Sequence, residues 1–235
     1  MEIIDRPSPN FGERAEGASV DLIVLHYTAM VDAEAALSRL CDPACEVSCH
    51  YLIARDGALY RLVDEDKRAW HAGEGAWAGQ GDVNSRSIGI ELDNDGASSF
   101  DEALMTSLEA LLVDLTERHD LPAKAVIGHA DMAPGRKRDP GRRFDWQRLA
   151  AENLSVWPEP SLRGDFMRDA AHFGYPVEAG QEAVLEVFRQ RFRPDATGPL
   201  NTADEVMMAG LARQFPADVT ERTARRIPSR PLHSM

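Results

Sequence analysis

The segment from residue 128 to residue 141 carries the densest set of side chains able to take part in chemistry. It reads G-H-A-D-M-A-P-G-R-K-R-D-P-G and sets His129, Lys137 and Asp139 between glycines and prolines. The apolar run Ala125-Val126-Ile127 before it predicts a short buried strand, so His129 should emerge at the end of that strand. The prolines and glycines that follow predict an extended, turning path and no helix. We therefore interpret this segment as a site loop.

A second histidine occupies an equivalent place in the chain. His26 lies at the end of an apolar strand predicted over residues 20–27 and is followed by small polar residues. A catalytic zinc site needs three protein ligands and one open position, and histidine with a carboxylate is an accepted donor set. Two strands that each end in histidine could converge on one ion, with Asp139 as the third ligand. A histidine after a strand is more often a hydrogen-bonded structural residue, and spacing alone leaves both interpretations open.

Five motifs, taken in order, carry a resemblance to a known family. They are H-Y-T (26–28), V-S-C-H-Y-L-I-A-R-D-G (47–57), A-W-H-A-G (69–73), N-S-R-S-I-G-I-E-L-D-N (84–94) and the site loop. Together they resemble the zinc-dependent N-acetylmuramoyl-L-alanine amidases of the AmpD/AmiD-like amidase-2 family, which is related to the peptidoglycan-recognition proteins. The resemblance covers about residues 20–150. It implies an α/β fold with a central mixed β-sheet flanked by helices.

The resemblance also implies a role for individual residues. His26, His129 and Asp139 would bind Zn²⁺, while Glu91 and Lys137 would be the catalytic residues. We expect the substrate, a muropeptide or peptidoglycan fragment, to be contacted by Tyr27, Arg55, Trp70, His71, Trp77 and Asn84. The resemblance places His71 in the cleft without metal contact. Tyr27 stands where the recycling members of the family commonly carry Asn, so the preference between 1,6-anhydro sugars and intact wall stays open.

The strand that should position the catalytic carboxylate is predicted over residues 87–92. Alternation puts Ile88, Ile90 and Leu92 on one face and Ser87, Gly89 and Glu91 on the other. The small residues beside Glu91 predict a cavity there, large enough for a water molecule and a substrate carbonyl. A glutamate on such a face is usually a solvated surface residue. An amphipathic helix predicted over residues 100–119 should cover the sheet.

The glycine-rich stretch of residues 68–84 is predicted to be a long loop. Trp70 and Trp77 in it suit stacking on sugar rings or peptide, or else they pin the loop to the core. His50 lies inside a strand predicted over residues 47–54, and we interpret it as a buried, hydrogen-bonded structural residue. Lys137 has a plain alternative as well, as a surface lysine in a basic turn.

The composition suits a folded enzyme, since 43% of the 235 residues are hydrophobic and 28% are charged. The net charge of −13 argues against nucleic acid or an anionic membrane as a partner. Positive charge gathers in the site loop and just after it, at Arg136, Lys137, Arg138, Arg142 and Arg143. This basic cluster could help an anionic muropeptide to approach, or it is a solvated turn.

Three cysteines spaced C-x3-C-x3-C (Cys41, Cys45 and Cys49) form neither an even disulfide framework nor a C-x2-C zinc pair. Reduced thiols are the favoured interpretation, with a Cys41–Cys45 disulfide as the alternative in an exported protein. No apolar run of membrane-spanning length and no signal-peptide pattern is present. The prediction from these observations is a cytoplasmic enzyme that acts on soluble muropeptides.

We predict four segments along the chain. They are an N-terminal arm lying over the surface (1–19), the zinc amidase domain (20–155), a small helical domain (161–216) and a mobile tail (217–235). Three predicted helices and the G-Y-P-V turn at 174–177 make the third segment resemble a three-helix peptidoglycan-binding module. A helical bundle that only stabilises the enzyme is the alternative.

Three other functions stay open. The chain could be a muropeptide-binding protein without activity, an envelope amidase acting on intact peptidoglycan, or a zinc amidase for another acylated amine. The motifs favour the muropeptide amidase because both catalytic residues and all three expected ligands are present. The oligomeric state is not predicted.

Overall fold

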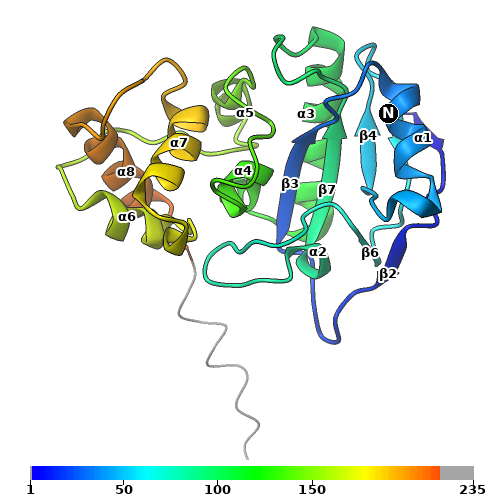
Figure 1. The fold of residues 1–235 in the computed structure, drawn as a ribbon, viewed down its shortest axis with the longest axis horizontal. Coiled ribbons are helices and arrows are strands. Elements are labelled where there is room, and N and C mark those ends of the chain that lie inside the picture. Colours follow the sequence, from blue (N-terminus) through cyan, green and yellow to red (C-terminus); the bar gives the residue numbers. More distant parts are fainter. Residues whose placement is uncertain (1, 218–235) are drawn as a thin grey trace, which may run out of the picture.

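A six-stranded mixed sheet forms the centre of the molecule in this computed structural model, which describes residues 2–217 (Figure 1). Residues 218–235, which make up nearly all of the predicted tail, lie outside the described part. The strand order is β1-β5-β4-β7-β3-β8. The strands are β1 (Ile3–Asp5), β3 (Leu22–Tyr27), β4 (Tyr51–Ile53), β5 (Leu59–Arg61), β7 (Ser87–Leu92) and β8 (Val126–Gly128). β3 runs parallel to β7 and β8, whereas β5 is antiparallel to β4. The predicted mixed α/β fold is confirmed.

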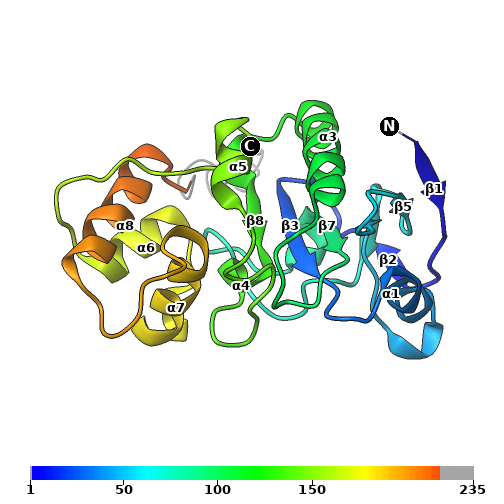
Figure 2. The same ribbon diagram turned by 90° about the horizontal axis from the view of Figure 1, so that it is seen from above.

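The residues of β3 alternate between two buried faces of the sheet. Ile23 and Leu25 face a core formed with α3 (Glu102–His119) and α5 (Trp146–Ala151). Leu22 and Val24 belong to a second core on the opposite face, the face to which His26 also points. α1 (Ala33–Leu40) covers that opposite face beside β4, and Figure 2 shows α3 and α1 on the two sides of the sheet. Burial on both faces explains the nearly continuous apolar sequence of β3.

The N-terminal arm corrects one prediction, because it takes part in the sheet and does not simply lie over the surface. β1 pairs in parallel with β5, and β2 (Phe11–Glu13) pairs with β6 (Lys67–Ala69) in a two-stranded sheet. Ser8 and Asn10 between them are buried and bond to backbone oxygens of the α1 region. The short polar arm gave no alternating pattern that would predict these pairings.

The loops carry short helical segments that the sequence pattern did not predict. These are α2 (Val83–Arg86), α4 (His129–Met132) and the 3₁₀ turns Pro43–Cys45, Ala123–Ala125 and Val177–Ala179. α4 corrects the predicted extended path after His129: one helical turn forms first and ends before Pro134, where the chain turns away.

Three helices follow the α/β part: α6 (Phe166–Phe173), α7 (Gln181–Phe192) and α8 (Thr202–Gln214). Asp165 caps α6 and Asn201 caps α8 through side-chain oxygens that accept backbone N–H bonds. Their apolar side chains share one core with Ile127 of β8 and Met132 of α4, and Figure 1 shows α7 beside α4. Within residues 2–217, no helix combines the length and apolar character needed to cross a membrane.

Candidate active site

Three parallel strands deliver the candidate residues to one edge of the sheet. His26 is the penultimate residue of β3 and is the register partner of Glu91 on β7. Leu25 pairs with Gly128, the last residue of β8, so His129 follows directly at the same edge. Because the carboxyl ends of parallel strands meet at one edge, side chains from segments more than a hundred residues apart come together. This is also the usual place of a ligand site in such sheets.

Asp139 returns to this edge through the site loop. Its backbone oxygen accepts a hydrogen bond from Ala130 N at 2.9 Å, which ties the far end of the loop to α4. Gly128 permits the close approach, since a Cβ there would lie 2.7 Å from Cδ of Pro140. The glycine before His129 and the proline after Asp139 therefore work together to bring the two side chains into contact.

The side chains of His26, His129 and Asp139 converge on one point. Nδ1 of His26 lies 2.9 Å from Nδ1 of His129, and each of these nitrogens lies 2.9 Å from Oδ2 of Asp139. All three residues are buried, with at most 8% of their surface exposed. Three donor atoms at this spacing can all lie about 2.0–2.2 Å from one ion, the distances that zinc adopts with nitrogen and oxygen ligands.

The charge states of these side chains suit a cation. Burial and the neighbouring His129 lower the pKa of His26 to about 4, so its imidazole is neutral at pH 7. Burial alone would raise the pKa of Asp139, but the close contacts of its carboxylate with the rings of His129 and His26 prevail and hold the pKa well below its usual range. Nε2 of His129 contacts the backbone oxygen of Ala72 at 2.8 Å. A carbonyl only accepts, so Nε2 carries a proton, and in the neutral form of the ring Nδ1 then has a lone pair that faces the centre.

Glu91 stands beside this centre with part of its carboxylate unsatisfied. Its Oε2 atom is buried and finds no hydrogen-bond partner among the described residues. Burial, together with the negative charge of Asp139, raises the pKa of Glu91 to about 8, although the positive charge of Lys137 acts in the opposite direction. A carboxyl group with one unpartnered oxygen and a pKa near neutrality, next to a metal-binding constellation, is a candidate general base.

A cleft of about 480 Å³ opens onto the centre. His26, His129, Asp139, Glu91 and Lys137 all contribute to its wall. Three of the six expected substrate contacts, Tyr27, Trp70 and His71, line it as well. Arg136 and Arg138 add positive charge, and the loop after β3 and one side of α1 complete the lining. The cleft therefore combines a metal-binding centre, an aromatic wall and a basic rim.

The other three expected substrate contacts lie elsewhere. Arg55 is exposed and pairs with Asp93 at 3.4 Å, outside the lining of the cleft. Oδ1 of Asn84 accepts hydrogen bonds from the backbone N–H groups of His71 and Ala72, so Asn84 holds the loop that carries His71.

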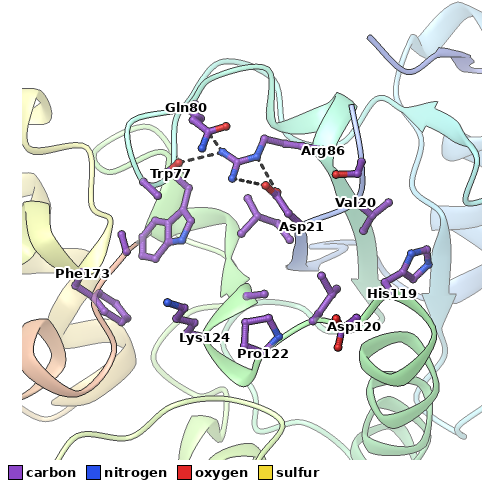
Figure 3. A pocket seen from close by; sticks show the side chains of 16 residues that line it. Val20, Asp21, Trp77, Gln80, Arg86, His119, Asp120, Pro122, Lys124 and Phe173 are labelled. Carbon is purple, nitrogen blue, oxygen red and sulfur yellow. Dashed lines mark hydrogen bonds and ion pairs between the residues drawn. The ribbon is translucent and has the colours of Figure 1, made fainter. Parts of the chain in front are cut away.

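Trp77 is only 4% exposed and packs against Phe173 and Tyr175 with ring centroids 5.4 and 5.3 Å apart. Figure 3 shows it beside Phe173 in a second pocket, in which Arg86 is paired with Asp21. This geometry matches the alternative stated for the tryptophans, in which they pin the loop to the core. Trp77 therefore lies outside the lining of the cleft that holds the metal-binding centre.

Glu91 does line the cleft, but the space over its small neighbour Gly89 is filled by another side chain, which corrects the predicted origin of the cavity. A Cβ built on Gly89 would lie 2.4 Å from Cγ of His71, so the imidazole occupies the space that Gly89 leaves open. The small residues of β7 make room for a histidine from the preceding loop. His50, in contrast, is buried and accepts a hydrogen bond from Gly89 N at 3.0 Å, as predicted for a structural histidine.

A pair of buried charges beside the site loop was not predicted from the sequence. Asp131 of α4 and Arg191 of α7 form an ion pair of 2.6 Å. Only 2% of the surface of Asp131 and 3% of that of Arg191 is exposed. The position of Arg191 on the apolar face of α7, next to Phe192 and three residues after Phe188, was the available signal. An arginine among core positions requires a buried acceptor elsewhere in the chain.

Comparison with known proteins gives a consistent result. A family model described as N-acetylmuramoyl-L-alanine amidase matches residues 16–142. The amidase AmiD of Escherichia coli is 33% identical over 236 residues, covering 85% of this chain and 84% of AmiD. The 1,6-anhydro-N-acetylmuramyl-L-alanine amidase AmpD of Citrobacter freundii is 35% identical over 162 residues, covering 62% of this chain and 87% of AmpD.

Solved structures show the same likeness. Escherichia coli AmiD in complex with the substrate anhydro-N-acetylmuramic acid-L-Ala-D-γ-Glu-L-Lys superposes with a TM-score of 0.78 at 29% identity. The match covers 89% of this chain and 99% of that one. AmpDh3 of Pseudomonas aeruginosa in complex with an anhydromuramic pentapeptide gives a TM-score of 0.75 at 29% identity, covering 84% of this chain and 93% of that one.

Proposed function

Because this chain belongs to the N-acetylmuramoyl-L-alanine amidase family, we propose that it hydrolyses the amide bond between the lactyl group of N-acetylmuramic acid and L-alanine in muropeptides. The observation that carries the proposal is the convergence of His26, His129 and Asp139 beside Glu91, whose Oε2 atom has no hydrogen-bond partner among the described residues. The anhydro-muropeptide complexes of the two similar structures support the 1,6-anhydro form as substrate. Such an activity would serve peptidoglycan recycling.

We propose that His26, His129 and Asp139 hold Zn²⁺. Two neutral imidazoles and one carboxylate are a common donor set for catalytic zinc and leave a position open for water or substrate. When bound, zinc would lower the pKa of a water molecule and polarise an amide carbonyl. The three side chains bring electron-rich atoms within 2.9 Å of one another, and a cation between these atoms would offset their mutual repulsion.

Glu91 would act first as a general base and then as a general acid. Its carboxylate would take a proton from the attacking water and pass it to the nitrogen of the departing L-alanine. A pKa near the working pH suits both steps, because the group must gain and lose a proton in each turnover. Lys137 would stabilise the negative charge that develops on the carbonyl oxygen, a role in which losing one donor typically costs about 10²–10³ in rate.

The lining of the cleft supports a division of roles for substrate binding. We propose that Tyr27 and Trp70 contact the sugar or peptide through their rings, which suit stacking on such groups. Arg138, exposed on the basic rim, would attract the carboxylates of the peptide. Arg136 is already engaged with the backbone oxygens of Ala72 and Glu74, so we assign it to holding the loop.

The decisive experiment is incubation of the full chain with a purified 1,6-anhydro-muropeptide, with and without a metal chelator. Free peptide detected by mass spectrometry, lost on chelation and regained with added zinc, is the expected result. Binding without any release of peptide would instead identify a muropeptide-binding protein. A panel of amides unrelated to the cell wall tests the remaining alternative of a different acylated amine, and faster cleavage of one of these would replace the proposed substrate.

The ligand assignment makes a prediction of its own. His129→Ala removes one of three ligands, so purified protein should lose most of its zinc, measured by elemental analysis. His172→Ala, the same substitution in α6 and outside the cleft, should keep the zinc content of the wild type. Zinc at full occupancy in His129→Ala would contradict the assignment.

We further propose that the enzyme acts in the cytoplasm. The three cysteines are free thiols in the structure, and closely spaced free thiols suit a reducing compartment. Fractionation of cells that express the untagged chain tests this location. Protein in the periplasm, or cleavage of isolated sacculi as fast as soluble muropeptides, would instead favour an envelope amidase.

The three C-terminal helices resemble a peptidoglycan-binding module, and we retain wall binding as a proposal for residues 161–216. Sedimentation of the protein with isolated sacculi measures it directly. If the protein does not sediment with sacculi, the helices only stabilise the enzyme, through the core that they share with β8 and α4.

A further inference from the structure

A continuous chain of polar contacts runs from the candidate metal centre into the sheet. Nε2 of His26, the ring nitrogen that faces away from the centre, lies 3.0 Å from Nδ1 of His71. Nε2 of His71 lies 3.1 Å from Oγ of Ser87, and this hydroxyl donates to the backbone oxygen of Val83 at 2.6 Å. This series of contacts therefore ends at the carbonyl oxygen of Val83, whose hydrogen-bonding role is fixed because a carbonyl oxygen can only accept.

The carbonyl oxygen at the end of this series determines where every proton between it and His26 lies. The hydrogen of Ser87 is committed to Val83, so towards His71 the hydroxyl can only accept, and Nε2 of His71 must donate. In a neutral imidazole the other nitrogen is then an acceptor, so Nδ1 of His71 accepts from Nε2–H of His26. His26 in turn has no proton on Nδ1, the atom that lies 2.9 Å from Oδ2 of Asp139.

From this network we propose that His71 is a positioning residue that fixes His26 in the tautomer with a bare Nδ1 facing the metal centre. The inference rests on the proposed zinc site and adds to it a reason for that site's affinity. Histidine ligands commonly donate their second ring N–H to a carboxylate, a carbonyl or water, and this bond sets tautomer and ring orientation. Here a second histidine, itself oriented by a serine, performs that task.

The surroundings of His71 are built to hold the ring in this place. Gly89 leaves the space that the imidazole fills, since an added Cβ would lie 2.4 Å from Cγ of His71. Oδ1 of Asn84 accepts from the backbone N–H of His71 at 3.0 Å and from that of Ala72 at 2.8 Å. The same loop bonds His129 through the backbone oxygen of Ala72. One loop thus sets the outer nitrogens of both histidine ligands.

His71 also lines the cleft, so a role in substrate binding or proton transfer is the competing explanation. The two explanations differ in what they predict without substrate. A residue that contacts only substrate changes KM or kcat and leaves metal affinity alone. A residue that orients a ligand weakens zinc binding in the absence of any muropeptide, so zinc affinity is the discriminating measurement.

The test is competition for zinc between the full chain and a chromophoric chelator. His71→Ala should weaken zinc binding about 10–100-fold, the usual effect of losing such a partner. His71→Asn keeps an oxygen that can accept near the position of Nδ1, so it should restore much of the affinity. Gly89→Ala should weaken binding as well, because the new methyl group displaces the ring. His172→Ala, outside the network, should bind zinc like the wild type.

A second measurement does not depend on the variants folding. ¹⁵N NMR of the histidine rings in the metal-free wild type should show His71 and His26 both protonated at Nε2. The opposite tautomer at His26, or a His71→Ala variant that folds and binds zinc within twofold of the wild type, would overturn the inference. Failure of the wild type itself to bind zinc or cleave muropeptide would instead defeat the proposed function, while the ring tautomers would still report on the network.

Discussion

Glu91→Gln should lower the turnover of a 1,6-anhydro-muropeptide by about 10²–10⁴-fold, the range for losing a general acid–base group. Zinc content and muropeptide affinity should stay close to those of the wild type, because Gln keeps the size of Glu and Glu91 is not among the three converging ligands. Single-turnover kinetics with matched zinc analysis separate the chemical step from binding. Glu117→Gln, an exposed residue of α3, is the matched control and should leave turnover unchanged.

The pH dependence provides an independent check on Glu91. A general base must be ionised, and burial raises the pKa of this carboxyl group from 4.5 to about 8. We therefore expect an acid limb in the rate profile of the wild type. A bound cation would move that limb to lower pH, because positive charge favours the carboxylate. Glu91→Gln should lose this limb along with its activity. Activity within a few-fold of the wild type, with the limb retained, would assign proton transfer to another group, such as His71.

The same pKa shift has a consequence for the stability of the metal-free protein. The pKa of Glu91 is higher in the folded than in the unfolded state, so folding takes up a proton between pH 4.5 and about 8. Its contribution to stability is complete below pH 4.5 and is lost as the pH rises through about 8. Glu91→Gln does not titrate, so above pH 8 the variant should unfold at a higher denaturant concentration than the wild type.

The strand ends of the candidate site could be predicted from the sequence because they depend on local patterns. Apolar runs that end in His26 and before His129 predict strands, and because the structure pairs these strands in parallel, their ends meet at one edge. The alternation around Glu91 correctly placed Ile88 and Ile90 in the core with α3. What these features share is that each can be read within one short window of sequence.

The features that the sequence did not predict depend on contacts between distant segments. The space beside Gly89 was predicted as a cavity, but a histidine from the loop before it fills that space. The sequence allowed Trp77 on that loop to face either substrate or core. It faces the core because it packs against the C-terminal helical segment. The pairing of β1 involves only three residues and carries no periodic signal. Such contacts follow from tertiary structure, which overrides local preference.

The C-terminal helices contact the candidate active site through a buried arginine and a buried tyrosine. Arg191 of α7 bonds Asp131 at 2.6 Å and donates to the backbone oxygen of Val126 and to Oγ of Ser155. The other oxygen of Asp131 accepts from the hydroxyl of Tyr175 at 3.0 Å. The guanidinium also lies 4.1 Å from the ring centre of Trp146. Asp131 is two residues from His129, so the turn that presents a proposed zinc ligand is anchored from another part of the chain.

This anchoring bears on the role of the helical segment. A detachable wall-binding module would leave the amidase intact when removed. Here its removal would leave Asp131 without its partner and would expose the core that Ile127 and Met132 share with the helices. We therefore expect a chain that ends before α6 to lose stability. AmpD differs in this respect, because 87% of its length matches only 62% of this chain. In this protein the helices and the site loop share one hydrophobic core.

Arg191→Met should lower the free energy of unfolding by about 3–5 kcal/mol, because removing one partner of a buried ion pair leaves an uncompensated charge. Urea unfolding of the metal-free protein measures this loss. Asp131→Asn combined with Arg191→Met removes both charges and should recover part of the stability, since a buried pair replaced as a whole is often close to neutral. Arg163→Met removes a largely exposed arginine, with 65% of its side chain accessible, that pairs with Glu205, and should cost no more than about 1 kcal/mol. If Arg191→Met costs as little as Arg163→Met, the ion pair does not anchor the site loop. If the large loss is found together with weaker zinc binding, the helices stabilise the metal centre through Asp131, since neither variant touches a proposed ligand.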